Sequence, residues 1–168
     1  WASAPPVPAE PEPPVFDRNR AAGVLGLAGA LVLGVSTFVA WAEITLSLLT
    51  ERTRSVSGWD WFDGQIQTGP LLCGLALLAA GLAGVLLAQT STLLVRIGIA
   101  GTGALSLGLA IFAISDIAER QAEVQRVGNV SIDFTAGMWL VVAGAAAILF
   151  AGAIADHRSS GSGVPVGA

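Results

Sequence analysis

Four long apolar runs leave few folds open to this chain. They cover residues 21–42, 70–88, 93–115 and 136–155, approximately. About 20 residues of helix cross the roughly 30 Å of hydrocarbon in a bilayer. Hydrophobic residues make up 54% of the chain and charged residues only 12%, which lies outside the usual range for soluble domains. We therefore expect an all-α integral membrane protein that crosses the cell membrane four times.

A ten-residue motif in the first run returns in the third. Residues 29–38 read Gly-Ala-Leu-Val-Leu-Gly-Val-Ser-Thr-Phe, and residues 103–112 read Gly-Ala-Leu-Ser-Leu-Gly-Leu-Ala-Ile-Phe, so six of the ten are identical. The motif predicts a duplicated helical hairpin. Because both hairpins enter from the same side, we expect a four-helix bundle with a pseudo-twofold axis along the membrane normal.

Small residues spaced by four follow the same repeat. In lipid, helices associate where small residues let their backbones approach closely. We expect these stripes to hold the first and third spans together and to leave no room for a wide channel. The stripes are Gly26, Ala30 and Gly34 in the first run, and Ala100, Ala104 and Gly108 in the third.

The two ends of the chain differ from the membrane domain, which we place at residues 21–158. Residues 1–20 are rich in proline and carry acids, so they favour extended conformation and bury no core. Pro13 and Pro14 are candidate contacts to a partner, the alternative being that this segment packs on the protein's own surface. Residues 159–168 form a flexible tail rich in glycine and serine.

The charges do not orient the spans. All eight cations are arginines, and they divide equally between the side of the termini and the side of the two longer loops. The longer loops carry most of the acids and tryptophans, so we expect cytoplasmic termini. The net charge of −4 and the scattered arginines argue against binding of nucleic acid.

Three aromatic residues lie close together in the first loop, at Trp59, Trp61 and Phe62. With Trp41 and Trp139 they suit an aromatic belt at the headgroup layer. The alternative is a docking patch for a partner protein. Two short alternating segments, 65–67 and 130–134, are predicted to pair as a small β-ribbon over the helix ends.

Glu43 and Asp116 occupy nearly equivalent positions in the repeat, near the loop-side ends of two spans. Ionisable groups inside a membrane often mark a proton path. The spans are long enough without them, which favours an interfacial position instead. A metal or haem site is not expected, because His157 is the single histidine and Cys73 the single cysteine. No pair of nucleophile and base suggests itself, so we expect neither an enzyme nor a cofactor.

The layout resembles the small four-span membrane proteins of actinobacteria. One span ends at Trp41, a Gly-Trp element follows at Gly58 and Trp59, and Gly137-Met138-Trp139 introduces the last span. In outline this is similar to the tryptophan-associated membrane proteins. Proteins of this kind also look like the accessory subunits of actinobacterial respiratory supercomplexes, which bridge larger subunits without holding cofactors.

Two functions remain open. The first is a non-catalytic accessory subunit that stabilises a larger membrane complex and contacts its subunits and lipids. The alternative is a small transporter or channel that uses the duplicated hairpins with Glu43 and Asp116.

Overall fold

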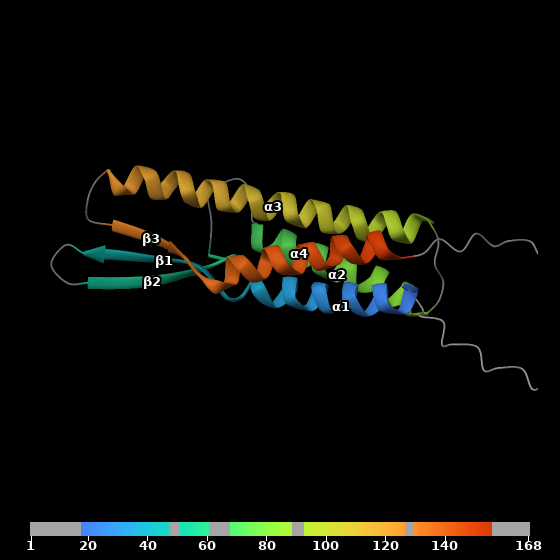
Figure 1. Ribbon diagram of the computed structural model, residues 1–168. Coiled ribbons are helices and arrows are strands. Elements are labelled where there is room, and N and C mark those ends of the chain that lie inside the picture. The colour runs from blue at the N-terminus through green and yellow to red at the C-terminus, as the bar shows by residue number, and fades with distance from the viewer. Residues whose placement is uncertain (1–17, 48–50, 61–67, 89–92, 127–129, 156–168) are drawn as a thin grey trace, which may run out of the picture.

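The fold combines four helices with a three-stranded sheet. The computed structural model describes residues 18–47, 51–60, 68–88, 93–126 and 130–155. Figure 1 shows the helices side by side, with the strands projecting from one end and the last turns of α3 beside them. The elements are α1 (Arg18–Ser36), β1 (Ala40–Ser47), β2 (Glu51–Ser57), α2 (Thr68–Leu87), α3 (Leu93–Gln125), β3 (Val130–Phe134) and α4 (Ala136–Ile154).

All four helices are long and apolar enough to cross a membrane. The helical fold with four candidate spans is therefore confirmed, and it is consistent with a multi-pass membrane protein. At about 1.5 Å per residue, the 33 residues of α3 extend to about 50 Å, well beyond a hydrocarbon core of roughly 30 Å. The last turns of α3 therefore leave the bundle and accompany the sheet.

The helices form a ring in which α1 and α3 each pack on α2 and α4. α1 and α3 consequently lie on a diagonal and make no extensive contact with each other. The prediction that the repeated motif holds the first and third spans together is therefore wrong, because each of these helices packs on α2 and α4 instead. A diagonal arrangement of equivalent helices is nevertheless the one that a twofold repeat of hairpins produces.

The predicted stripe on α1 does lie at helix contacts. Gly26 is buried between α2 and α4, where an added Cβ would lie 3.2 Å from the Cβ of Ala83. Ala30 is also buried, and Gly34 faces Ala76 of α2. These residues let α1 approach its two neighbours closely.

The predicted stripe on α3 mostly faces outward. Ala104 and Gly108 are exposed, and a Cβ added at Gly108 would meet nothing within 4 Å, so their predicted packing role is wrong. Ala100 alone of this stripe touches α4, at Gly152. The reason is that α3 buries an adjacent face, formed by Ile99, Thr102, Gly103, Ser106 and Ala110.

Glycines on α4 and its neighbours bring the helix backbones together. A Cβ on Gly144 would lie 2.7 Å from the backbone nitrogen of Leu33 and 2.9 Å from the carbonyl oxygen of Gly29. On the other side of α4, a Cβ on Gly152 would lie 2.6 Å from the nitrogen of Ala100. Backbone atoms have no rotamer by which to yield, so only glycine fits at these crossings.

The first predicted span is too long at its C-terminal end. The helix stops at Ser36, and residues 40–47 form β1. The hydroxyls of Ser36 and Thr37 bond back to the carbonyls of Leu33 and Gly34, at 2.7 Å each, which competes with continuation of the helix. The following residues alternate between apolar and polar side chains, as a half-buried strand does.

The sheet has the order β2-β1-β3 and is antiparallel throughout. The predicted strand at 130–134 is confirmed as β3, but it pairs with β1. The other predicted strand, 65–67, lies outside the described residues. The central strand β1 therefore joins β2, its neighbour in sequence, to β3, which directly precedes α4.

We predict that Gly144→Ala destabilises the protein whereas Gly108→Ala does not. The first change forces α4 away from α1, which should lower the free energy of unfolding by about 1–3 kcal/mol. The second adds a methyl group in open space and should change it by less than about 0.5 kcal/mol. Thermal unfolding of the full chain in one detergent, followed by circular dichroism, compares the two. A larger loss of stability in Gly108→Ala than in Gly144→Ala would contradict the observed packing.

Candidate functional site: the sheet-side end of the bundle

Trp41 joins the bundle to the sheet. Its side chain is 0% exposed, and its indole N–H donates to the carbonyl of Ser36 at 2.9 Å. Its own carbonyl accepts from the backbone N–H of Thr135 at 3.0 Å, immediately before α4. The prediction that Trp41 belongs to an aromatic belt is therefore wrong, because the ring lies inside the protein.

Three glycines fit around this tryptophan and its strand. A Cβ added at Gly58 would lie less than 3.0 Å from atoms of the Trp41 ring. The backbone N–H of Gly69, at the start of α2, donates to the carbonyl of Gly58 at 3.1 Å. Gly137, at the start of α4, sits against the carbonyl of Ala40. Both helices that follow the loops thus begin in contact with the base of the sheet.

The two faces of the sheet differ in chemistry. The register places Ile44 between Arg54 and Ile132, and Ala42 between Val56 and Phe134. This inner face is turned toward α3, and Val56 and Ile132 are buried. On the outer face, Glu43 lies between Ser55 and Asp133, so that face carries acids and hydroxyls.

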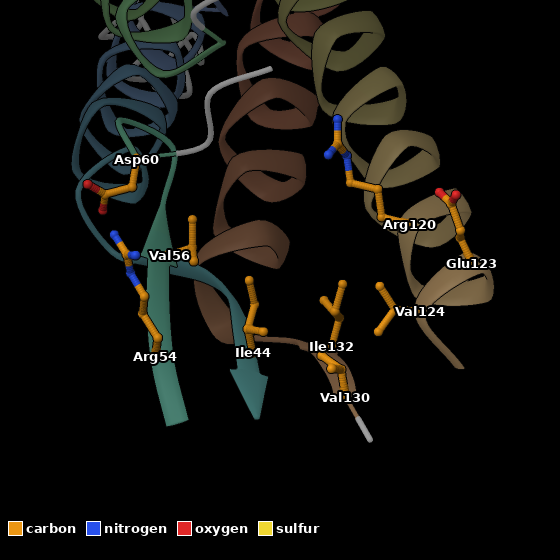
Figure 2. Close-up of a pocket in the computed structure, with 9 residues that line it drawn as sticks. All are labelled: Ile44, Arg54, Val56, Asp60, Arg120, Glu123, Val124, Val130 and Ile132. Atoms are coloured by element: carbon orange, nitrogen blue, oxygen red, sulfur yellow. The ribbon is translucent and has the colours of Figure 1, made fainter. Parts of the chain in front are cut away.

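A cavity of about 410 Å³ lies between the inner face of the sheet and the extension of α3. Figure 2 shows Ile44, Ile132 and Val130 beside Val124, the Arg54 guanidinium beside Asp60, and the Arg120 guanidinium extending from α3 toward the neighbouring helix of the bundle. The lining consists of five aliphatic residues, Ile44, Val56, Val124, Val130 and Ile132, and four charged ones, Arg54, Asp60, Arg120 and Glu123.

Asp60 is held ionised in the turn that follows β2. The hydroxyl of Ser57 donates to its carboxylate at 2.8 Å and the backbone N–H of Ser57 does so at 3.2 Å. The bond from the Ser57 hydroxyl is the main reason that the pKa of Asp60 lies below its ordinary value of 3.8, and the bond from the Ser57 backbone adds to it. The Arg54 guanidinium lowers the pKa further. The carboxylate is therefore charged at neutral pH.

Exposed aromatic side chains mark the same end of the bundle. The ring of Trp59 stacks on Phe38 with centroids 5.4 Å apart and an interplanar angle of 22°. The indole N–H of Trp59 also donates to the hydroxyl of Thr37 at 3.3 Å, which fixes the ring. Trp59 is 46% exposed and Trp139 64% exposed, so both are available to lipid or to a partner. Among the other predicted contacts, Trp61, Phe62, Pro13 and Pro14 lie outside the described residues.

The structure separates the two acids that the repeat relates. Glu43 is exposed on the outer face of β1, whereas Asp116 lies on α3 and forms an ion pair with Arg120 at 3.2 Å. They belong to different kinds of element because the chain after α1 becomes a strand and α3 continues as a helix. The ion pair between Asp116 and Arg120 has the spacing of one helical turn that the sequence shows.

Sequence reasoning did not identify Phe38, Arg54 or Arg120 as members of this site. Phe38 closes the repeated motif, but nothing in the sequence places it against Trp59. Arg54 and Arg120 come from opposite walls of the cavity, on β2 and α3, and only the folded structure places both along it. Within the described ranges, no three His, Cys, Asp or Glu residues gather into a group suited to a metal ion.

No protein-family model matches the chain, and no curated protein matches it either. The function must therefore be argued from the site itself.

We predict that Trp41→Phe destabilises the protein more than Trp139→Phe. The first variant removes the shorter of two hydrogen bonds to the Ser36 carbonyl, the other being from the N–H of Val39, and leaves space beneath Gly58. Together these losses should cost about 1–3 kcal/mol in the free energy of unfolding. The second changes an exposed ring and should be nearly neutral. Equal losses in thermal unfolding measurements would contradict the role given to Trp41.

The charged form of Asp60 should stabilise the fold above its ordinary pKa. Since the folded state lowers the pKa from 3.8, the contribution is present at neutral pH and is lost as the pH falls below about 3.8, through the folded-state pKa. Asp60→Asn should therefore be less stable than wild type near neutral pH, and the difference should shrink in acid. Denaturant unfolding over a pH series measures this, with Asp133→Asn as the control. A difference that is constant with pH would contradict it.

Proposed function

We propose that this protein is a non-catalytic association subunit that spans the cell membrane four times and stabilises a larger membrane protein complex. The resemblance to small actinobacterial membrane proteins favours a respiratory supercomplex as that complex. The proposed orientation places the termini in the cytoplasm and the sheet on the opposite side. Lipids and larger membrane subunits are the proposed partners.

The observation that carries this proposal is the fixed, exposed aromatic pair of Phe38 and Trp59. Aromatic anchors give much of the binding energy at protein interfaces, and anchors that are already held in place lose less entropy on binding. Stacking and the bond to Thr37 hold the Trp59 ring. The pair lies at the edge between the apolar bundle and the polar sheet, where a partner subunit can contact both.

The outer faces of the helices support the same proposal. Large apolar side chains are exposed on every helix of the bundle, as expected for surfaces that meet lipid tails or other transmembrane helices. They include Leu31 on α1, Leu77 on α2, Leu105 and Phe112 on α3, and Phe150 on α4.

The interior of the bundle gives the transporter alternative less support. The hydroxyls of Ser36, Thr102 and Ser106 donate to carbonyls of their own helices at 2.7–2.9 Å, and the hydroxyl of Thr37, just after α1, donates to the carbonyl of Gly34 at 2.7 Å. They therefore bond locally rather than across the bundle. Close contacts at Gly144 and Gly152 also hold α1, α3 and α4 near one another. Glu43 lies outside the bundle, so the two acids of the alternative do not form one path.

Extraction of the tagged full chain from its native membrane in mild detergent, followed by native mass spectrometry, tests the proposal. Wild-type protein should co-purify with larger subunits in fixed stoichiometry. Trp59→Ala should lose these subunits, because it removes an interface anchor, whereas Leu77→Ala on the outer face of α2 should keep them.

A monomeric wild-type protein without partners would contradict the proposed association. For the transporter alternative, Glu43→Gln and Asp116→Asn are the relevant variants. The association proposal predicts that both retain the complex, since neither residue belongs to the aromatic pair.

A further inference from the structure

The cavity between the sheet and α3 is not used by the proposed association function. It is bounded by β1, β2 and β3 on one side and by the last turns of α3 on the other. Its volume of about 410 Å³ falls within the roughly 300–1,000 Å³ typical of small-molecule sites. The cavity is therefore large enough for a ligand of its own.

The cavity lies beyond the length of bundle that can face lipid tails. Val124, one of its lining residues, is in the last turn of α3. That helix extends to about 50 Å, whereas the hydrocarbon core of a bilayer is roughly 30 Å thick. Apolar side chains along the bundle can meet lipid, but those of the cavity otherwise meet water. An apolar ligand that displaces this water is therefore favoured by the hydrophobic effect.

The interior of the cavity is aliphatic. Val56 and Ile132 are buried, and Ile44, Val124 and Val130 are half-buried. The nine lining residues that belong to the described chain include no aromatic side chain, so the walls provide no ring on which a planar ligand could stack. Such walls suit an aliphatic molecule.

The charged lining residues lie at the rim. Arg54, Asp60 and Glu123 are exposed, so water solvates them. The Arg54 guanidinium lies beside the ionised Asp60 carboxylate, and Arg120 is paired with Asp116 at 3.2 Å. The Glu123 carboxylate points away from the strands (Figure 2). A charged ligand would have to compete with these pairs or lose hydration without a countercharge, which favours an uncharged one.

The backbone beneath the cavity is used by the sheet. Ile44 lies on the central strand, between Arg54 of β2 and Ile132 of β3. The N–H and C=O groups of a central strand bond to the neighbours on its two sides. A peptide laid over this surface would find no backbone partner there, and burying its polar groups unpaired costs free energy. The walls therefore favour a hydrocarbon over a peptide or a sugar.

We propose that this cavity binds an uncharged aliphatic molecule, of the fatty-alcohol or terpene class. The hydrocarbon part lies against Ile44, Ile132 and Val124. A hydroxyl group on the ligand lies at the rim and remains in water. The ligand is a free molecule, since the site lies outside the hydrocarbon layer that holds the tails of bilayer lipids.

A photoreactive alcohol tests the proposal. The full chain in phosphatidylcholine nanodiscs is irradiated with decanol that carries a diazirine near its methyl end, and the labelled residues are mapped by mass spectrometry. We expect labels on β1, β3 and the last turns of α3, and competition by unmodified decanol. Labels confined to outward-facing residues of the helices, such as Leu77 and Leu105, would overturn the proposal.

Three competitors of one chain length test the absence of charge. Decanol should compete best, and decanoate and decylammonium about tenfold more weakly at equal free concentration, because an ion loses more than a hydroxyl does at the edge of an aliphatic cavity. Arg54→Gln should leave competition by decanol unchanged. Competition by either ion that equals that of decanol, or a tenfold loss in Arg54→Gln, would overturn the uncharged ligand.

Two leucine and isoleucine variants of β1 provide the matched control for the position of the chain. Ile44→Ala should weaken competition by decanol about tenfold, the loss expected when buried methylene groups are removed. Leu46→Ala should leave it unchanged, because Leu46 lies on the same face of the same strand but does not line the cavity. Equal effects of the two changes would overturn the site.

Two further arms address occupancy and the source of the chain. Val124→Phe should fill part of the cavity and reduce its labelling while the protein retains cooperative thermal unfolding. Undiminished cavity labelling in this folded variant would overturn the site, and the pair of β1 variants decides the question if it does not fold. In a parallel arm the diazirine is carried by an acyl tail of phosphatidylcholine within the nanodisc. Cavity labelling by this lipid and not by decanol would overturn the proposal of a free molecule.

Discussion

The close backbone contacts of α4 with α1 and α3 are the interaction on which the rest of the structure depends. Gly144 admits the backbone of α1, and Gly152 admits that of α3. Peptide atoms rather than flexible side chains therefore set both spacings. Because α1 leads into β1, α4 follows β3, and α3 extends beside the sheet, the same spacings determine the distance between the two walls of the cavity.

Trp41 connects the helix bundle to the sheet. One buried side chain contacts the end of α1 through Ser36 and the end of β2 through Gly58, while its backbone bonds to Thr135 before α4. The sheet itself is small, and strands of this number need a packed face for stability. The buried ring provides part of that face, and Gly58, which packs on the ring, directly precedes Trp59 of the exposed aromatic pair.

The sequence predicts the helices well because long apolar runs have few alternative structures. It does not predict the end of α1, because residues 40–42 are as apolar as the helix before them and the strand pattern appears only from Glu43 onward. Nor does it show which face of α3 is buried, since small residues such as Gly103 and Gly108 occur on both faces. The cavity could not be predicted, because its lining comes from three strands and α3, and the pairing of β1 with β3 that brings these elements together joins residues far apart in sequence.

That pairing makes completion of the sheet depend on nearly the whole chain. During synthesis β1 and β2 emerge together and can form a hairpin early. The partner on the other side of β1 is β3, which emerges only after α2 and α3 have been made. A long-range pairing of this kind closes late, so a polypeptide truncated before residue 130 retains an open edge on its central strand. The finished sheet thus requires both hairpins, and a chain that stops earlier leaves one edge of β1 without its partner strand.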